Sequence, residues 1–115
     1  MAKYPSGTVA WAVDPTGAHE TRPVIVLAHE NRPYNSVECT IMSLGTEPDK
    51  YDHYTPQLEE SHLTGINFGK PTVLLPWSLY TIPPSTIEAG RAHGTLTAEG
   101  EKLVKKGLLS LFTGP

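Results

Sequence analysis

The stretch HETRPVIVLAHE, residues 19–30, determines how this chain can fold. Its centre, Val24 to Leu27, contains four apolar residues in a row, which is typical of a strand buried on both faces or of a short buried helical segment. Pro23 biases Arg22 towards an extended backbone, which favours the strand. Polar and charged residues stand directly before it: His19, Glu20, Thr21 and Arg22. We therefore predict a buried strand over 23–30 with a cluster of polar groups at its start.

Further strand patterns lie on both sides of this segment. Residues 7–14 alternate between larger and smaller or polar side chains, which predicts a half-buried strand. Additional short strands are predicted over 37–43, 53–60, 71–82 and 94–97. Pro56 indicates an edge strand, and Pro76 indicates a bulge or bend. Because short turns join neighbouring strands, we expect an antiparallel sheet that curls into a small barrel.

The C-terminal part of the sequence has the pattern of a helix. Thr97 can cap its first turn, and two glutamates follow at positions where the helix dipole favours acidic groups. The helix is predicted to run to about residue 112. An apolar stripe at helical spacing is expected to face the barrel: Leu103, Val104, Leu108, Leu111 and Phe112. The fold class is therefore predicted as mainly β with a C-terminal helix (α+β), in one domain over 1–115.

Composition limits the classes of function. The chain has 115 residues, 21 of which are Gly or Pro, and this content fits a β domain with many turns. The net charge of −3 gives no global attraction to nucleic acid, so any RNA binding must come from a local patch. The single cysteine, Cys39, cannot form an intramolecular disulfide, which suits a cytoplasmic protein. No signal peptide and no membrane span are expected.

The sequence lacks the common motifs for nucleotide binding, nucleophilic catalysis and zinc binding. There is no P-loop, dinucleotide fingerprint, nucleophile elbow or HExxH helix, and the five histidines are not spaced as metal ligands. We therefore expect no metal and no cofactor. The compact group at 19–22 is the better candidate, because a strand buried on both faces ends at the rim of the sheet. There Arg22 either pairs structurally with Glu20 or Asp14, or serves a functional site.

The sequence also resembles the MazF/PemK family of toxin endoribonucleases. GTVAWAVDPTGAHETRPVIVLA (7–28) is similar to the opening of that family, which has a G-x-V-x-W strand, an acidic-Pro loop and an R-P-[AV]-[LV]-V-[LI] strand. NRPYNSVECTIMS (31–43) resembles its turn and third strand, and SLYTI (78–82) resembles its Q-[VI]-[RK]-[TS]-I strand. HGTLTAEGEKLVKKGLLSLF (93–112) resembles its last strand and helix. The R-P-V-x-V-L element is the most specific of these matches.

This resemblance implies an SH3-like barrel that forms a homodimer and cleaves single-stranded RNA without a metal. It also implies an antitoxin partner whose flexible segment covers the RNA groove. The functional arginine of the family falls on Arg22, and its catalytic threonine falls on Ser43, with Thr46 as a nearby substitute. Two departures occur on a later strand, where Ser78 replaces a Gln and Tyr80 replaces a basic residue.

Metal-free RNA cleavage by the 2′-OH needs a stabilised phosphorane and two proton transfers. Arg22 suits the first role, because its planar fork can hold two phosphate oxygens. His19 and Glu20 are candidates for proton transfer, and Ser43 for donating a hydrogen bond to the phosphate. Trp77 and Tyr80 could stack on unpaired bases. Two alternatives remain open: a barrel that binds RNA or a peptide without cleaving it, and a purely structural dimerising domain.

Overall fold

The structure, a computed structural model, describes residues 3–114. Within that range the chain forms seven strands, one α-helix and three short 3-10 helices. The strands are β1 (Thr8–Val13), β2 (Thr21–Ala28), β3 (Cys39–Gly45), β4 (Gln57–Leu58), β5 (Leu63–Thr64), β6 (Thr72–Ile82) and β7 (Gly94–Leu96). The helix is α1 (Ala98–Thr113), and the 3-10 helices are Pro48–Tyr54, Glu60–His62 and Pro84–Thr86.

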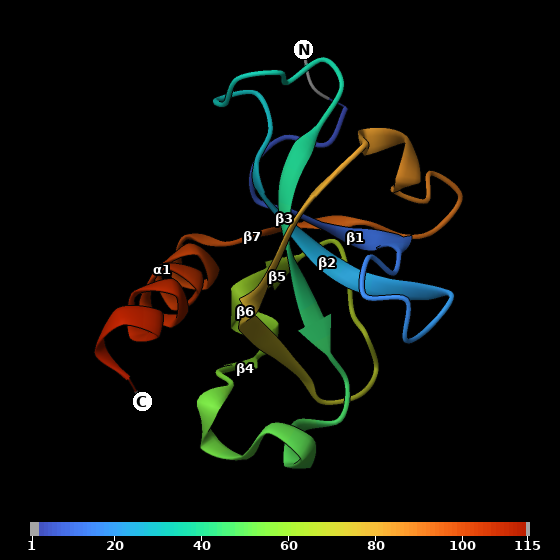
Figure 1. Ribbon diagram of the computed structural model, residues 1–115. Helices are drawn as coiled ribbons and strands as arrows, with labels where there is room; N and C mark the ends of the chain where they lie inside the picture. Colours follow the sequence, from blue (N-terminus) through green and yellow to red (C-terminus); the bar gives the residue numbers. More distant parts are fainter. Residues whose placement is uncertain (1–2, 115) are drawn as a thin grey trace.

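One antiparallel sheet contains all of these strands, in the order β4-β6-β3-β2-β1-β7-β5. Its two edge strands, β4 and β5, are separated along the chain by the 3-10 helix Glu60–His62 alone. The sheet therefore curls back towards itself into a nearly closed barrel, and α1 lies on one side of it (Figure 1). The predicted fold class, a small antiparallel β-barrel with a C-terminal helix, is confirmed.

Strand β2 is at the centre of the sheet, between β1 and β3. Its apolar residues alternate between two hydrophobic clusters, with Val24 and Val26 in one and Ile25 in the other. All three side chains are fully buried, and each such burial stabilises the fold by about 1.5–3 kcal/mol. The prediction of a strand buried on both faces is confirmed.

The strand predicted at residues 7–14 is present as β1, but the prediction that only one of its faces is buried is wrong. Val9 faces one hydrophobic cluster, while Ala10 and Ala12 face the other, and all three are buried. The two alanines are small enough for Tyr4 and Ile87 to pack in the same cluster. The small side chains in this strand therefore mark a second packing face rather than a solvated one.

Strand β3 lies two residues further along the chain than its predicted range of 37–43. The backbone N–H groups of Val37 and Glu38 both donate to the carbonyl oxygen of Tyr34, at 3.1 and 3.0 Å. These two residues therefore belong to the preceding turn, in which Tyr34 has a φ of 61°. At its other end the strand continues past Ser43 to Gly45, which pairs with Val73 of β6.

The bulge expected near Pro76 is present in β6. Met42 of β3 is paired with Leu79, whereas Leu44 is paired with Leu74, so β6 contains extra residues between these pairs. The other proline prediction is confirmed only in part. Strand β4 is indeed an edge strand, but it has two residues, because the 3-10 helix Pro48–Tyr54 takes up the start of the predicted strand 53–60.

Helix α1 begins as predicted, with the Thr97 hydroxyl accepting a hydrogen bond from the N–H of Gly100 at 3.1 Å. The predicted apolar stripe is only partly correct, because Leu111 and Phe112 are exposed. The start of the helix packs tightly on the 3-10 helix Glu60–His62, where a Cβ on Gly100 would lie 2.3 Å from the carbonyl oxygen of His62. The end of the helix lies beyond the surface that buries Val104.

Candidate functional site

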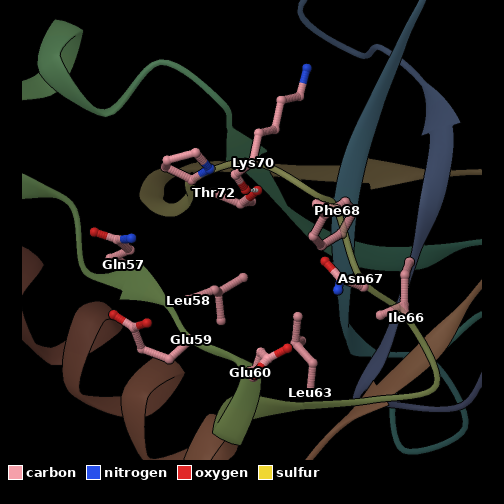
Figure 2. A pocket seen from close by; sticks show the side chains of 11 residues that line it. Gln57, Leu58, Glu59, Glu60, Leu63, Ile66, Asn67, Phe68, Lys70 and Thr72 are labelled. Atoms are coloured by element: carbon pink, nitrogen blue, oxygen red, sulfur yellow. Dashed lines mark hydrogen bonds between the residues drawn. The ribbon is translucent and has the colours of Figure 1, made fainter.

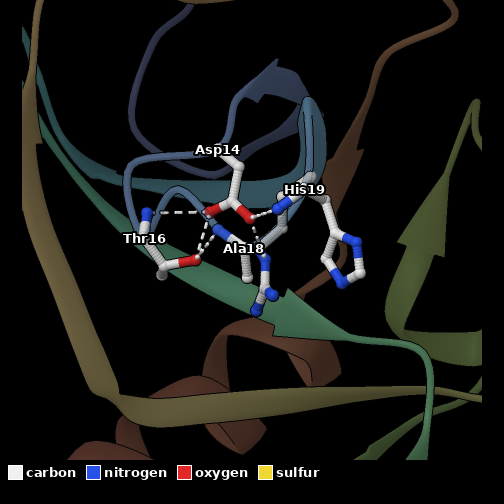
Figure 3. Close-up of polar contacts among 5 residues, drawn as sticks. Asp14, Thr16, Ala18 and His19 are labelled. Atoms are coloured by element: carbon white, nitrogen blue, oxygen red, sulfur yellow. Dashed lines mark hydrogen bonds and ion pairs between the residues drawn. The ribbon is translucent and has the colours of Figure 1, made fainter.

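Asp14 organises the loop between β1 and β2. Its Oδ1 accepts hydrogen bonds from the backbone N–H and the hydroxyl of Thr16, at 2.8 and 2.7 Å. Its Oδ2 accepts from the backbone N–H of His19 at 3.0 Å and from Nε of Arg22 at 3.3 Å. Figure 3 shows the carboxylate between the donors of Thr16 and His19. The loop is therefore folded around one buried carboxylate, which ties it to the start of β2.

The Asp14 carboxylate is ionised in this setting. Burial alone would raise its pKa, but the hydrogen bonds from Thr16 and His19 and the charge of Arg22 outweigh burial and lower the pKa. The side chain of Asp14 is 0% exposed, whereas that of Arg22 is 12% exposed. Of the two structural partners considered for Arg22, the structure selects Asp14. The ion pair fixes Nε, and it leaves the two terminal nitrogens of the guanidinium without a described hydrogen-bond partner.

Arg22 lines a cleft of about 440 Å³ at the mouth of the barrel. One wall is the β1–β2 loop with His19 and Glu20. The opposite wall is the end of β3 and the segment that follows it, with Thr46. The cleft thus brings together four of the predicted site residues: Arg22, His19, Glu20 and Thr46.

Two lysines that the sequence did not single out also line this cleft. Lys50 comes from the 3-10 helix Pro48–Tyr54, and Lys70 comes from the loop before β6. Both lysines are far from Arg22 in the sequence, so the sequence does not show that these three cationic residues line the same cleft. The negative net charge does not indicate it either. Together with Arg22 they give the cleft three cationic groups against the carboxylates of Glu20 and Glu47. Because the ionised Asp14 balances Arg22, the charges around the cleft are close to neutral in sum, and the two lysines are the cations left to contact phosphates of a bound strand.

Ser43 does not reach the cleft. It is paired with Val24 in the β2–β3 register, is 0% exposed, and its Oγ has no hydrogen-bond partner. Continuing this antiparallel register by two residues puts Gly45 opposite Arg22. Thr46, directly after it, is partly exposed and lines the cleft. On this wall of the cleft, Thr46 therefore offers the hydroxyl for the role that the resemblance assigned to Ser43.

The predicted binding residues of β6 lie outside the cleft. Trp77 follows Pro76 in the bulge, is 49% exposed, and its ring lies 5.7 Å from that of Tyr51, a cleft residue. Ser78 is buried, and Tyr80 is half-buried against a hydrophobic cluster. Trp77 instead lines an apolar groove of about 430 Å³ against α1. Of the three residues, only Trp77 is connected to the cleft, through Tyr51.

A further pocket of about 340 Å³ lies beside the edge strand β4. Figure 2 shows Leu58 on one side of it and Ile66 and Phe68 on the other. These apolar side chains pack against the hydrophobic cluster of the barrel. None of the predicted site residues lines this pocket, so the cleft at Arg22 remains the candidate site.

Among the residues whose side chains the structure describes, 3–51 and 55–114, no group of three or more His, Cys, Asp or Glu side chains is arranged to hold a metal ion. Cys39 is fully buried, and burial raises the pKa of its thiol above the usual value. In the same range, no helix combines the length and apolar character needed to cross a membrane.

The fold and cleft define a class of small antiparallel β-barrels with a C-terminal helix and an arginine at the mouth of the barrel. One solved structure with this fold is the Mycobacterium tuberculosis toxin MazF-mt6, with a TM-score of 0.66 and 21% sequence identity over 91% of this chain and 95% of that chain. No protein-family model and no curated protein matches the sequence. The resemblance to MazF toxins is therefore confirmed for the fold.

Proposed function

We propose that this protein is a toxin endoribonuclease that cleaves single-stranded RNA. The observation that carries the proposal is the Arg22 guanidinium, held through Nε by buried Asp14 at the edge of a cleft that also contains Thr46, His19 and Glu20. An arginine fixed in this way can present its remaining N–H groups to two phosphate oxygens before substrate arrives. The shared fold with a MazF toxin supports the same assignment.

The cleft residues suit attack by the 2′-OH on the adjacent phosphorus. A bond forms between the 2′-oxygen and phosphorus, the bond to the 5′-oxygen breaks, and a cyclic phosphate and a free 5′-OH result. Glu20 or His19 accepts the proton of the 2′-OH, and the other donates a proton to the leaving oxygen. Arg22 stabilises the charge that develops on the phosphorane. Lys50 and Lys70 attract neighbouring phosphates of the strand.

Thr46 and Ser43 give a direct test of this site. Thr46→Ala should slow cleavage of a long single-stranded RNA about tenfold, because a neutral hydrogen bond to the phosphate is lost. Ser43→Ala should leave cleavage unchanged, since its hydroxyl is buried without a partner. Initial rates measured in EDTA with both variants make the comparison. A loss confined to Ser43→Ala would refute the assignment of Thr46, and binding of RNA by the wild type without any product would favour the binding module instead.

We also infer that the protein dimerises and is neutralised by an antitoxin. The apolar groove beside Trp77, together with the exposed side chains of Leu109, Leu111 and Phe112 on α1, supports an interface on this side of the barrel. Sedimentation at micromolar concentration should give twice the 12.5 kDa mass of the chain.

Co-expression with the product of a neighbouring reading frame should yield a complex that does not cleave RNA. A monomer in the first experiment, or a fully active complex in the second, would refute the respective inference.

A further inference from the structure

Arg91 lies on the surface next to the cleft and stacks on an aromatic ring. Its guanidinium carbon is 3.7 Å from the centre of the Trp11 ring. Its Nη1 donates a hydrogen bond to the hydroxyl of Thr21 at 3.2 Å and lies 3.6 Å from a carboxylate oxygen of Glu88. Trp11 and Thr21 both line the cleft that contains Arg22. The guanidinium plane is thus held at the edge of the candidate RNA site.

The segment that carries Arg91 is attached to the barrel. The N–H of Glu88 donates to the carbonyl oxygen of Trp11 at 2.8 Å, and Ile87 forms an isolated β-bridge with Ala12. The Trp11 ring is in turn packed edge-on against Phe68, with 5.9 Å between the ring centres. Trp11 supports the Arg91 guanidinium, and Phe68 in turn supports Trp11. The position of the guanidinium is therefore fixed before any ligand binds.

The Arg91 side chain remains 41% exposed although Trp11 covers one of its faces. Guanidinium groups are weakly hydrated and stack well on flat π-systems, and single-stranded RNA is commonly recognised by stacking of unpaired bases on arginine planes. Glu88 offsets part of the charge of Arg91. This favours contact with a flat base over contact with another phosphate.

We propose that Arg91, supported by Trp11, forms a base-stacking subsite for the nucleotide next to the phosphate held by Arg22. Thr21, which receives the hydrogen bond from Arg91, and Trp11, on which Arg91 stacks, line the same cleft as Arg22. A strand whose phosphate lies on Arg22 can therefore lay a neighbouring base on Arg91. The subsite selects for unpaired bases, since a base inside a duplex has no free face. This inference rests on the proposed RNA-cleaving function of the cleft.

The test compares binding by the wild type, Arg91→Lys and Arg32→Lys. Lysine keeps the charge but lacks the planar face, and Arg32 is a matched control because it pairs with Glu38 beyond the far end of β2. The probes are fluorescein-labelled 2′-O-methyl 8-mers of A, C, G and U, which lack the nucleophile, and an abasic 8-mer with the same backbone. Fluorescence anisotropy gives each Kd.

Arg91→Lys should weaken binding of the best base-bearing 8-mer about tenfold, as expected for one stacked base, and should leave the abasic 8-mer unchanged. Arg32→Lys should match the wild type throughout. Equal binding of all four base-bearing 8-mers by Arg91→Lys and the wild type would overturn the subsite, as would an equal loss for the abasic probe. If the subsite fails while Arg22→Ala still slows RNA cleavage by about 100-fold or more, only the subsite is wrong. Failure of the wild type to bind any probe would overturn the subsite and the RNA function together.

Discussion

Replacing Arg22 by alanine is expected to slow cleavage of single-stranded RNA by about 100- to 1000-fold. The variant loses the positive charge that we propose stabilises the phosphorane, and loss of one such group in a preorganised site typically has an effect of this size. Arg22→Lys should recover only part of the rate, because lysine keeps the charge but lacks the planar fork. The measurement is the initial rate of cleavage of a long RNA in EDTA.

The structure determines the controls for this experiment. Because Nε of Arg22 donates to a fully buried carboxylate, Arg22→Ala should also lower the free energy of unfolding by about 1–3 kcal/mol. Rates must therefore be measured well below the unfolding temperature, with circular dichroism on each variant. Arg32→Ala is the matched control, since it breaks the ion pair with Glu38 outside the cleft. Cleavage by Arg22→Ala at the wild-type rate would refute the site.

The barrel could be predicted from the sequence because its central strand has a short apolar run with a proline at its start. The run from Val24 to Leu27 fits a buried strand or a short buried helical segment, and Pro23 favours the strand because it biases Arg22 towards an extended backbone. The position of Arg22 at the rim follows from the same pattern. The ion-pair partner of Arg22 does not follow from this pattern, because Glu20 and Asp14 are both close to Arg22 in the sequence. Only the fold of the loop, which buries Asp14, decides between them.

The opposite wall of the cleft could not be predicted with the same accuracy. The turn at Tyr34 delays the start of β3, and pairing with β6 extends its end to Gly45, so the residue that follows the strand differs from the predicted one. Thr46 therefore lines the cleft, whereas Ser43 lies in the core. Lys50 and Lys70 come from two separate loops, and periodicity says nothing about where such loops meet.

The bulge in β6 explains why the later predicted site residues are not in the cleft. Pro76 was sufficient to predict an irregularity, but not the number of residues in it. Each extra residue changes which face the following side chains occupy. Trp77 is consequently exposed beside α1, and Ser78 is buried. Pattern matching to a regular strand cannot reproduce this arrangement.

Asp14→Asn is expected to lower the free energy of unfolding by about 3 kcal/mol at pH 7. The carboxylate accepts four hydrogen bonds, one of them from Arg22. An amide has one oxygen, so its NH₂ group would face N–H donors and leave some of them unpaired in a buried place. Breaking one partner of a buried ion pair typically has a cost of this order. Urea unfolding of both proteins measures the difference.

The same variant has a pH signature whose sign follows from the lowered pKa of Asp14. Because the folded-state pKa lies below that of the unfolded chain, about 3.9, the carboxylate stabilises the fold fully above the unfolded value. This stabilisation is lost as the pH falls through the folded-state pKa. The difference in stability between wild type and Asp14→Asn should therefore be largest near pH 7 and should narrow below about pH 4. Glu30→Gln serves as the control, because Glu30 also has a lowered pKa, through hydrogen bonds from Ser6, but is exposed and follows β2 rather than belonging to the β1–β2 loop. A difference between wild type and Asp14→Asn that stays constant down to pH 2 would show that the charge of Asp14 does not hold Arg22 in place.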